Sequence, residues 1–289
     1  MPVDTPIVAA VDGSEHALAA VRWAASAAAR EKCPLLVMSA VSPLHPSFSL
    51  AAVSLEQSIV DADHAFAEAA LDNAAAIAEE TAPGVTVTRQ VVVGKPSLAL
   101  RELSSRARTV VVGRRGLGGV SGLLLGSVST DITANADCPV VVVSGETPSR
   151  GPVVVGVDGS PVSTAAIAAA FEQASLLGTT ITAVHAYGGF SSTAFFGEGE
   201  KVLREIHDGA VASLGSQLAG HRTDYPDVTV DAVVTAESPS EKLSALSADA
   251  QLIVLGSRGR GGFRGLMLGS TSQAVLHVAT CPVMVVHSS

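Results

Sequence analysis

The sequence predicts an α/β protein built from two tandem doubly wound domains, each a parallel sheet with helices on both faces. The first observation is a repeat, because the segment Ile7–Ser14 (IVAAVDGS) is matched by Val153–Ser160 (VVVGVDGS). The second is that short runs of β-branched residues alternate with Ala-rich segments in both halves. Because five such runs alternate with four segments that suit helices, each half predicts a five-stranded sheet.

The repeat also predicts the domain limits. The chain has 289 residues, which suits two domains of ordinary size. A period of about 145 residues is too long for a solenoid unit and indicates duplication of a whole domain. We expect domain 1 over residues 1–144 and domain 2 over residues 152–289, joined by a linker at 145–151 that contains several turn-forming residues.

The first strand and the first helix follow from local signals. Residues 7–11 are small or β-branched without interruption, as expected for a strand buried on both faces. Ser14 is a good N-cap for an Ala-rich helix that ends near Lys32. The second half agrees, because Ser160 is followed by Pro161, a residue favoured at the first helical position.

The later elements continue the alternation of strands and helices. The predicted second strand spans residues 35–41 and is matched by residues 180–187 in the second half. A long helix follows, and we expect its apolar face to contain Leu55, Ile59, Ala62, Phe66 and Ala69. The remaining predictions for the first half are a strand at 85–93, a helix at 96–105, a strand at 109–112, a helix at 127–136 and a strand at 140–143.

A glycine motif follows the fourth predicted strand of each half. Gly113 and Gly116 are followed, after nine residues, by Gly126-Ser127, and the same spacing recurs at Gly256, Gly259 and Gly269-Ser270. Glycine lets the backbone approach a ligand, and the N–H groups at a helix N-terminus attract phosphate. Glycines also mark turns, but the same spacing in both halves favours an anion cradle. In parallel sheets, ligands bind beyond the strand C-termini, where both motifs fall.

Charge narrows the class of ligand. The formal net charge is −9, which argues against general affinity for nucleic acid. Five basic side chains nevertheless fall inside the two glycine motifs, namely Arg114, Arg115, Arg258, Arg260 and Arg264. Basic glycine loops on an acidic protein suggest small anionic ligands.

Cysteine usage and hydropathy predict a cytoplasmic location. Cys33, Cys138 and Cys281 form no C-x-x-C motif, and their odd number suits a reducing compartment. No apolar run approaches the roughly 20 residues of a membrane span, and no secretory signal is visible. We therefore expect neither a membrane nor a nucleic acid as a partner.

These motifs resemble the universal stress proteins of the ATP-binding type, and the resemblance covers essentially the whole chain. The shared pattern is G-x-x-G, nine residues, then G-S/T after the fourth strand, with an aspartate at the end of the first strand. The resemblance implies a sheet order of 3-2-1-4-5, ATP bound where the strand order reverses, and pairing of two such domains. Such pairing can occur within the chain, between chains or both, and we expect a dimer or other homo-oligomer.

The resemblance assigns ATP-binding roles to residues of the first half. The small Ala10 leaves room for the nucleoside, and Asp12 offers carboxylate oxygens to adenine or ribose, although an aspartate before Gly13 also suits a simple turn. The implied site 1 comprises Ala10, Asp12, Val41, Val112, Gly113, Arg114, Arg115, Gly116, Gly118, Gly119, Gly126, Ser127, Val128 and Ser129.

The second half carries the corresponding set. The implied site 2 comprises Gly156, Asp158, Tyr187, Leu255, Gly256, Arg258, Gly259, Gly261, Gly262, Gly269, Ser270, Thr271 and Ser272. Tyr187 stands where the first half has Val41, and its ring has the size to fill part of an adenine pocket. Thr271 stands where the first half has Val128.

The absence of known catalytic motifs favours a binding protein. The sequence contains neither a P-loop motif, G-x-x-x-x-G-K-S/T, nor a nucleophile elbow, G-x-S-x-G. ATP is the expected ligand, alone or with Mg²⁺, but Asp12 and Asp158 are too few carboxylates to predict a catalytic Mg²⁺ site.

Three functional hypotheses remain open. The leading one is a stress-response regulator that binds one adenine nucleotide per domain and acts through linked conformations and an unidentified protein partner. The alternative is a slow ATPase or autophosphorylating enzyme that uses the same sites, with Asp12 or Ser129 assisting. The third is an interaction protein in which the second site binds no nucleotide.

Overall fold

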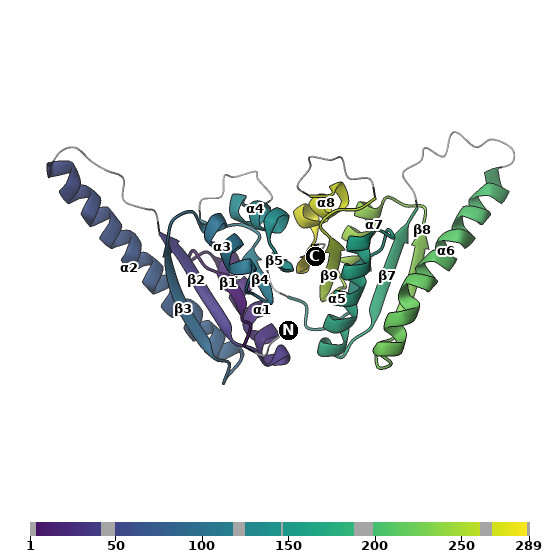
Figure 1. The fold of residues 1–289 in the computed structure, drawn as a ribbon, viewed down its shortest axis with the longest axis horizontal. Coiled ribbons are helices and arrows are strands. Elements are labelled where there is room, and N and C mark those ends of the chain that lie inside the picture. The colour runs from purple at the N-terminus through teal and green to yellow at the C-terminus, as the bar shows by residue number, and fades with distance from the viewer. Residues whose placement is uncertain are drawn as a thin grey trace. The chain divides into compact units, whose positions relative to one another are not determined.

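The computed structural model describes residues 4–41, 50–117, 125–145, 147–187, 199–260 and 268–287. The chain divides into two compact units, residues 1–146 and residues 147–289. Each unit alternates strands and helices along the chain (Figure 1). The α/β class with parallel sheets, predicted from the alternation of apolar runs, is confirmed.

The first unit contains nine elements within its described residues. In chain order they are β1 Ile7–Ala10, α1 Glu15–Glu31, β2 Leu35–Val41, α2 Leu50–Thr81, β3 Val87–Val93, α3 Pro96–Ser104, β4 Thr109–Gly113, α4 Ser127–Asn135 and β5 Val140–Val143. The strands are parallel and lie in the order β3-β2-β1-β4-β5. The strand order therefore reverses between β1 and β4.

The second unit repeats this arrangement in its described part. Its elements are β6 Val153–Gly156, α5 Pro161–Leu177, β7 Ile181–Ala186, α6 Gly199–Asp224, β8 Val230–Thr235, α7 Pro239–Leu246, β9 Leu252–Gly256, α8 Ser270–Val278 and β10 Val283–Val286. The order β8-β7-β6-β9-β10 is again parallel, and it reverses between β6 and β9.

Helices cover both faces of each sheet. In the first unit α1 packs with α2 on one face, and α3 packs with α4 on the other. In the second unit the corresponding pairs are α5 with α6 and α7 with α8. The central strands are buried except at their last residue, as in β4, where Val110 and Val111 have no exposed surface. Strands covered on both faces need this continuous apolar character.

The helix ends follow the local sequence signals. Ser14 is the N-cap of α1, and its hydroxyl accepts the Ala17 N–H at 3.3 Å. The helix ends at Lys32, which adopts a left-handed conformation with φ 52°. In α5 the corresponding cap is Ser160, followed by Pro161 at the first helical position.

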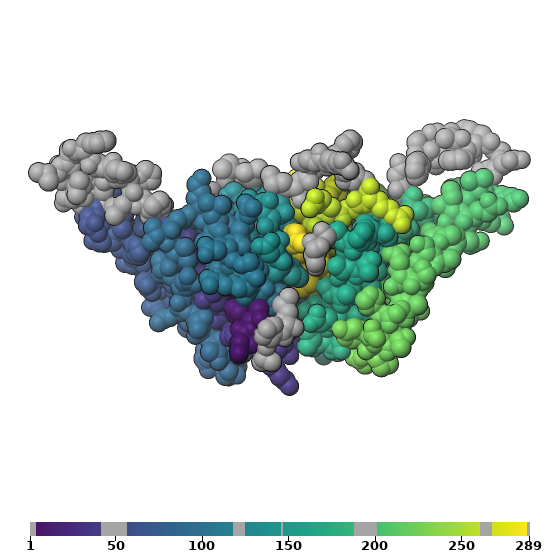
Figure 2. Space-filling model, in the orientation of Figure 1, coloured from purple at the N-terminus to yellow at the C-terminus, as the bar shows by residue number. Residues whose placement is uncertain are grey.

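The apolar face of α2 differs from the prediction. Ile59 is 53% exposed and Phe66 is 55% exposed, and Ala62 and Ala69 are exposed as well. Leu55 lies outside the residues whose side chains the structure describes. The buried face consists instead of Ala67, Ala70, Leu71, Ala74 and Ala78. Alanines let the helix approach α1 and the sheet closely, so the face with the smaller side chains packs on the core. The long helices α2 and α6 lie on the surface of their units (Figure 2).

Candidate nucleotide site

A cavity lies in the first unit at the C-terminal ends of β1 and β4, where the strand order reverses. It encloses about 390 Å³, within the range of small-molecule sites. Its lining residues are Ala10, Val11, Asp12, Ala17, Met38, Ala40, Pro96, Val112, Gly113, Arg115, Gly116, Leu125, Gly126, Ser127, Val128 and Ser129. We refer to this space as cavity 1.

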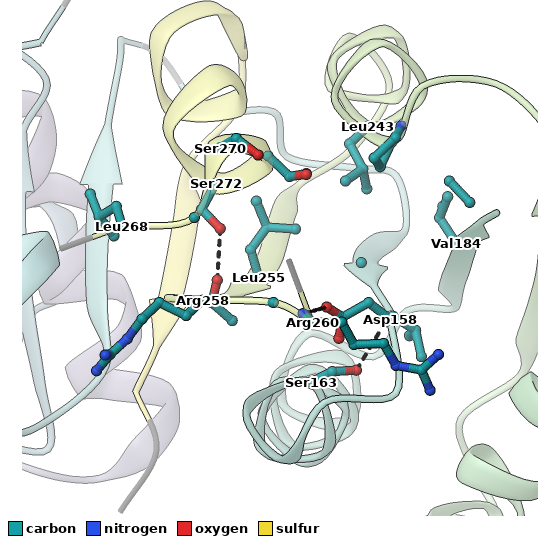
Figure 3. Close-up of a pocket in the computed structure, with 18 residues that line it drawn as sticks. Asp158, Ser163, Val184, Leu243, Leu255, Arg258, Arg260, Leu268, Ser270 and Ser272 are labelled. Carbon is teal, nitrogen blue, oxygen red and sulfur yellow. Dashed lines mark hydrogen bonds between the residues drawn. The ribbon is translucent and has the colours of Figure 1, made fainter. Parts of the chain in front are cut away.

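The second unit has a corresponding cavity, cavity 2, at the ends of β6 and β9 (Figure 3). It encloses about 560 Å³ and is lined by Gly156, Val157, Asp158, Ser163, Val184, Ala186, Pro239, Leu243, Leu255, Gly256, Arg258, Gly259, Arg260, Leu268, Gly269, Ser270, Thr271 and Ser272. Figure 3 shows Val184 and Leu243 on one side of the space and the start of α8, with Ser270, on another. One part of the wall is therefore apolar, and another contains a helix N-terminus.

The helices that begin at these cavities have no side-chain cap. The N-cap of α4 is Gly126 and that of α8 is Gly269, and no side-chain hydrogen bond caps either helix. The helices α1 and α5 differ, because Ser14 and Ser160 cap them. The first amide groups of an α-helix have no partner within the helix. The starts of α4 and α8 therefore offer N–H donors and the positive end of a helix dipole to an anion in the cavity.

An aspartate fastens the glycine loop to the end of the first strand in each unit. The Asp12 Oδ2 atom accepts the Leu117 N–H at 2.8 Å, and its Oδ1 atom accepts the Ser14 hydroxyl at 2.6 Å. In the second unit Asp158 Oδ2 accepts the Arg260 N–H, also at 2.8 Å. Both carboxylates thus hold the loop in place and still have free lone pairs for a ligand donor.

Two serine hydroxyls hold the loops from the opposite side. Ser129 donates its hydroxyl proton to the Gly113 carbonyl at 2.7 Å, and Ser272 donates to the Gly256 carbonyl at the same distance. Both serines are buried. Each hydroxyl thus joins the start of its helix to the end of β4 or β9.

The glycines of the motif serve different purposes. A methyl group at Gly116 would meet the Asp12 carboxylate, and one at Gly113 would lie 2.6 Å from the His16 backbone carbon. These two glycines are therefore required by the protein's own packing. A methyl group at Gly126 would meet its nearest neighbour, the Arg114 carbonyl oxygen, at 3.5 Å, an ordinary contact distance. Packing alone does not require glycine at that position.

Most of the predicted site residues lie together around the cavities. In the first unit Ala10, Asp12, Val112, Gly113, Arg115, Gly116 and Gly126 to Ser129 all line cavity 1. In the second unit Gly156, Asp158, Leu255, Gly256, Arg258, Gly259 and Gly269 to Ser272 line cavity 2. Gly118, Gly119, Gly261 and Gly262 lie outside the described residues, as does Arg264.

Three predicted residues do not line the cavities. Arg114 is not part of the wall, and the Val41 carbonyl accepts the Gly94 N–H at 2.9 Å. The Tyr187 side chain points toward α6, where its ring packs edge-on against the His207 ring, with 6.0 Å between the ring centroids. Tyr187 is therefore not part of the wall of cavity 2, where the small residue Ala186 lies instead, as Ala40 does in cavity 1.

Sequence reasoning missed other parts of the wall. These are Val11, Ala17, Met38, Ala40, Pro96 and Leu125 in cavity 1, and Val157, Ser163, Val184, Ala186, Pro239, Leu243 and Leu268 in cavity 2. Arg260, noted above only as a basic residue of the glycine motif, also lines cavity 2. Residues one and three positions before the predicted Val41 face the cavity because side chains alternate along a strand. The prolines were recognisable as the first residues of short helices, but their distance from the glycine loop in sequence concealed their role.

The two cysteine thiols whose pKa values are raised, those of Cys33 and Cys138, do not line the cavities. Burial raises the pKa of the Cys138 thiol to about 12 and also raises the pKa of Cys33. Neither cysteine lines a cavity. Among the described residues, no group of three His, Cys, Asp or Glu side chains is arranged to hold a metal ion. Within the same residues, no helix has the length and apolar character needed to cross a membrane.

Comparison with known proteins gives the same family for both halves. The model of the universal stress protein family matches residues 5–144 and 150–287. A universal stress protein of Mycobacterium tuberculosis strain H37Rv is 37% identical over 291 residues, covering 98% of this chain and 97% of that protein. One from Mycolicibacterium smegmatis is 38% identical over 287 residues, covering 97% and 96%.

A solved structure agrees at the level of the fold. The crystal structure of a universal stress protein from Archaeoglobus fulgidus superposes with a TM-score of 0.68 at 19% identity, covering 98% of this chain and 96% of that one. The two family-model matches and the full-length relatives therefore identify this chain as a member of the universal stress protein family.

Proposed function

We propose that each unit, taken as the domains 1–144 and 152–289, binds one molecule of ATP and that occupancy regulates a stress response. The observation that carries this proposal is that each cavity combines a helix start without a side-chain cap and apolar lining residues. The amides suit the phosphates, and the apolar wall suits an adenine ring. The cavity volumes, about 390 and 560 Å³, also suit a ligand of nucleotide size.

The regulatory mechanism would be thermodynamic linkage. Asp12 and Ser129 connect the glycine loop to β1 and to α4, so a ligand that contacts the loop also contacts the elements on both sides of it. A nucleotide that favours one arrangement of this loop changes the surface offered to a protein partner. We further propose that the protein acts in the cytoplasm as a homo-oligomer and that Mg²⁺ accompanies ATP.

The test is to count the nucleotides that the protein retains. The full chain is purified without added nucleotide and denatured, and the released nucleotides are identified by chromatography and mass. The proposal predicts about two ATP molecules per chain. Release of mostly ADP would favour a slow ATPase, whereas one nucleotide per chain would favour an interaction protein with a single functional site.

Two pairs of variants connect binding to the helix amides. Ser127→Pro and Ser270→Pro each remove one helix N–H, whereas the matched controls Ser127→Ala and Ser270→Ala remove only the hydroxyl. The proline is compatible with the fold, because Gly126 has φ −73° and ψ 156°, close to the −75° and 159° of Ser160 before Pro161.

We expect each proline variant to lose about one nucleotide per chain and each alanine variant to retain about two. Circular dichroism confirms that both members of a pair are folded. If the folded proline variants retain as many nucleotides per chain as the wild type, the hypothesis that the helix starts bind phosphate is wrong. If the wild-type chain neither releases nucleotide nor binds added ATP in calorimetry, the ATP proposal as a whole is wrong.

A further inference from the structure

The glycine loops of the two cavities differ at several positions, and one of these differences adds a charge to the wall of cavity 2. The residue after the second glycine is Leu117 in the first unit and Arg260 in the second. Both backbone N–H groups donate to the aspartate Oδ2 atom at 2.8 Å. Because the backbones are held in the same way, the difference between the units lies in the side chain.

Each of these side chains lies over the glycine that follows the aspartate. In the first unit a methyl group at Gly13 would lie 3.1 Å from the Phe66 ring and 4.0 Å from Leu117 Cδ1. In the second unit a methyl group at Gly159 would instead meet the Arg260 guanidinium. An apolar pair in one unit is therefore replaced by a cation in the other.

The long helix beside the loop also differs in sequence between the two units. Phe66 precedes the buried Ala67 of α2, and the residue in the same register of α6 is Gly209, before the buried Ala210. A methyl group at Gly209 would have no neighbour within 4 Å among the described residues. Where the first unit has an aromatic ring beside the loop, the described residues of the second unit place no side chain at this register of the helix, and Arg260 lines the cavity.

The starts of α4 and α8 also differ, and again the side chain in the second unit is the more polar one. Thr271 lines cavity 2 and provides a hydroxyl, whereas the matching residue of cavity 1 is Val128. The other charged groups of the walls are shared, since Asp12 and Arg115 of cavity 1 match Asp158 and Arg258 of cavity 2. Lys95 and Arg114 are specific to the first unit, but neither lines its cavity.

We propose that Arg260 makes cavity 2 selective for nucleotides with more phosphates, and that cavity 1 lacks this selectivity. The inference rests on the proposed nucleotide function and adds a distinction between the two sites. Both cavities offer helix amides to the first phosphate that reaches them. The additional guanidinium in cavity 2 favours ATP over AMP, because hydrogen bonds between arginine and phosphate are charge-assisted.

The test compares the cavities one at a time by calorimetry with ATP, AMP and adenosine. For ATP and AMP, whose phosphates need the helix amides, the Ser127→Pro chain reports on cavity 2 and the Ser270→Pro chain reports on cavity 1. We expect the ratio of the AMP dissociation constant to the ATP dissociation constant to be roughly 10-fold higher in cavity 2. Arg260→Leu in the cavity 2 chain should remove this excess and leave adenosine affinity unchanged, while Arg260→Lys should retain part of it.

The reciprocal variant completes the test. Leu117→Arg in the cavity 1 chain should raise its ATP preference. Equal ratios in the two chains, or an Arg260→Leu variant that weakens adenosine and ATP alike, would overturn the selectivity proposal while leaving nucleotide binding intact. Absence of ATP binding in the wild-type chain and in both single-cavity chains would contradict the proposed function itself.

Discussion

The Asp12 carboxylate accepts the Leu117 N–H at 2.8 Å and so joins the end of β1 to a loop that follows β4. The same connection recurs between Asp158 and Arg260. In each unit one carboxylate thus closes the cavity wall between the two strands at which the strand order reverses. The aspartate therefore stabilises the loop by a hydrogen bond and is also a candidate ligand-binding group.

Replacing this carboxylate by an amide should loosen the loop. The Asn amide nitrogen donates hydrogen bonds and accepts none. In Asp12→Asn, therefore, either the Leu117 N–H loses its acceptor or the N–H and hydroxyl of Ser14 lose theirs. We expect the free energy of unfolding to fall by about 1–3 kcal/mol and amide exchange at Leu117 to accelerate. Urea unfolding and hydrogen exchange measure these changes. Asp63→Asn, on the exposed surface of α2, is the control, and unchanged exchange at Leu117 would contradict the role of Asp12.

The glycines of one motif should differ in their tolerance of alanine. Gly116→Ala places a methyl group against the Asp12 carboxylate, so we expect clear destabilisation. Gly126→Ala meets only ordinary contacts at 3.5 Å or more, and its φ of −73° suits any residue. Its cost should stay below about 1 kcal/mol. Urea unfolding of both variants checks the order, and a Gly126→Ala chain that is the less stable of the two would show that the contacts are misjudged.

The two faces of α2 should respond differently to substitution. Leu71 is 1% exposed, so Leu71→Ala should cost about 2–5 kcal/mol through lost burial and a residual cavity. Ile59 is 53% exposed, and Ile59→Ser should change stability by less than about 0.5 kcal/mol. Thermal and urea unfolding measure both effects. A large cost for Ile59→Ser would instead support the face that the sequence predicted.

The Cys138 thiol should react slowly and ionise only in strong base. Burial raises its pKa from 9.0 to about 12, so near pH 8 it forms about a thousandfold less thiolate than an ordinary thiol. The measurement is the rate of alkylation in a chain with Cys33→Ala and Cys281→Ala, with the urea-unfolded chain as control. The folded-state rate should keep rising with pH above 10, where that of the unfolded chain levels off. Equal rates in both states would contradict the raised pKa.

The same shift has a consequence for stability. Because the folded-state pKa lies above the unfolded value, the contribution of Cys138 is fully present below pH 9 and is lost as the pH rises toward 12. The wild-type chain should therefore lose stability between pH 9 and pH 10.5 more steeply than Cys138→Ala. Urea midpoints measured at both pH values decide the question, and parallel pH profiles would count against it.

Strands and helix starts were predictable because their signals are local. Ser14 and Pro161 mark helix starts by capping and by a fixed φ, and the strand at 35–41 has the predicted limits. The glycine loops were predictable because their spacing occurs twice. The face of α2 was not, since Phe66 and Leu71 are both apolar and only the packed structure distinguishes them. Val41 was named in place of Ala40 because the family resemblance implies a main-chain contact at the end of the strand, whereas the side chains that line the cavity lie one and three residues earlier.

The glycine N-caps of α4 and α8 have a consequence for the lifetime of the protein. A bound phosphate would act as the missing cap, and a ligand at 100 times its dissociation constant adds about 2.7 kcal/mol to the stability of the state that binds it. Under the proposed function, a chain made while nucleotide is scarce would open more often and expose more backbone to proteases. The amount of this protein would then follow the energy state of the cell without any change in its synthesis.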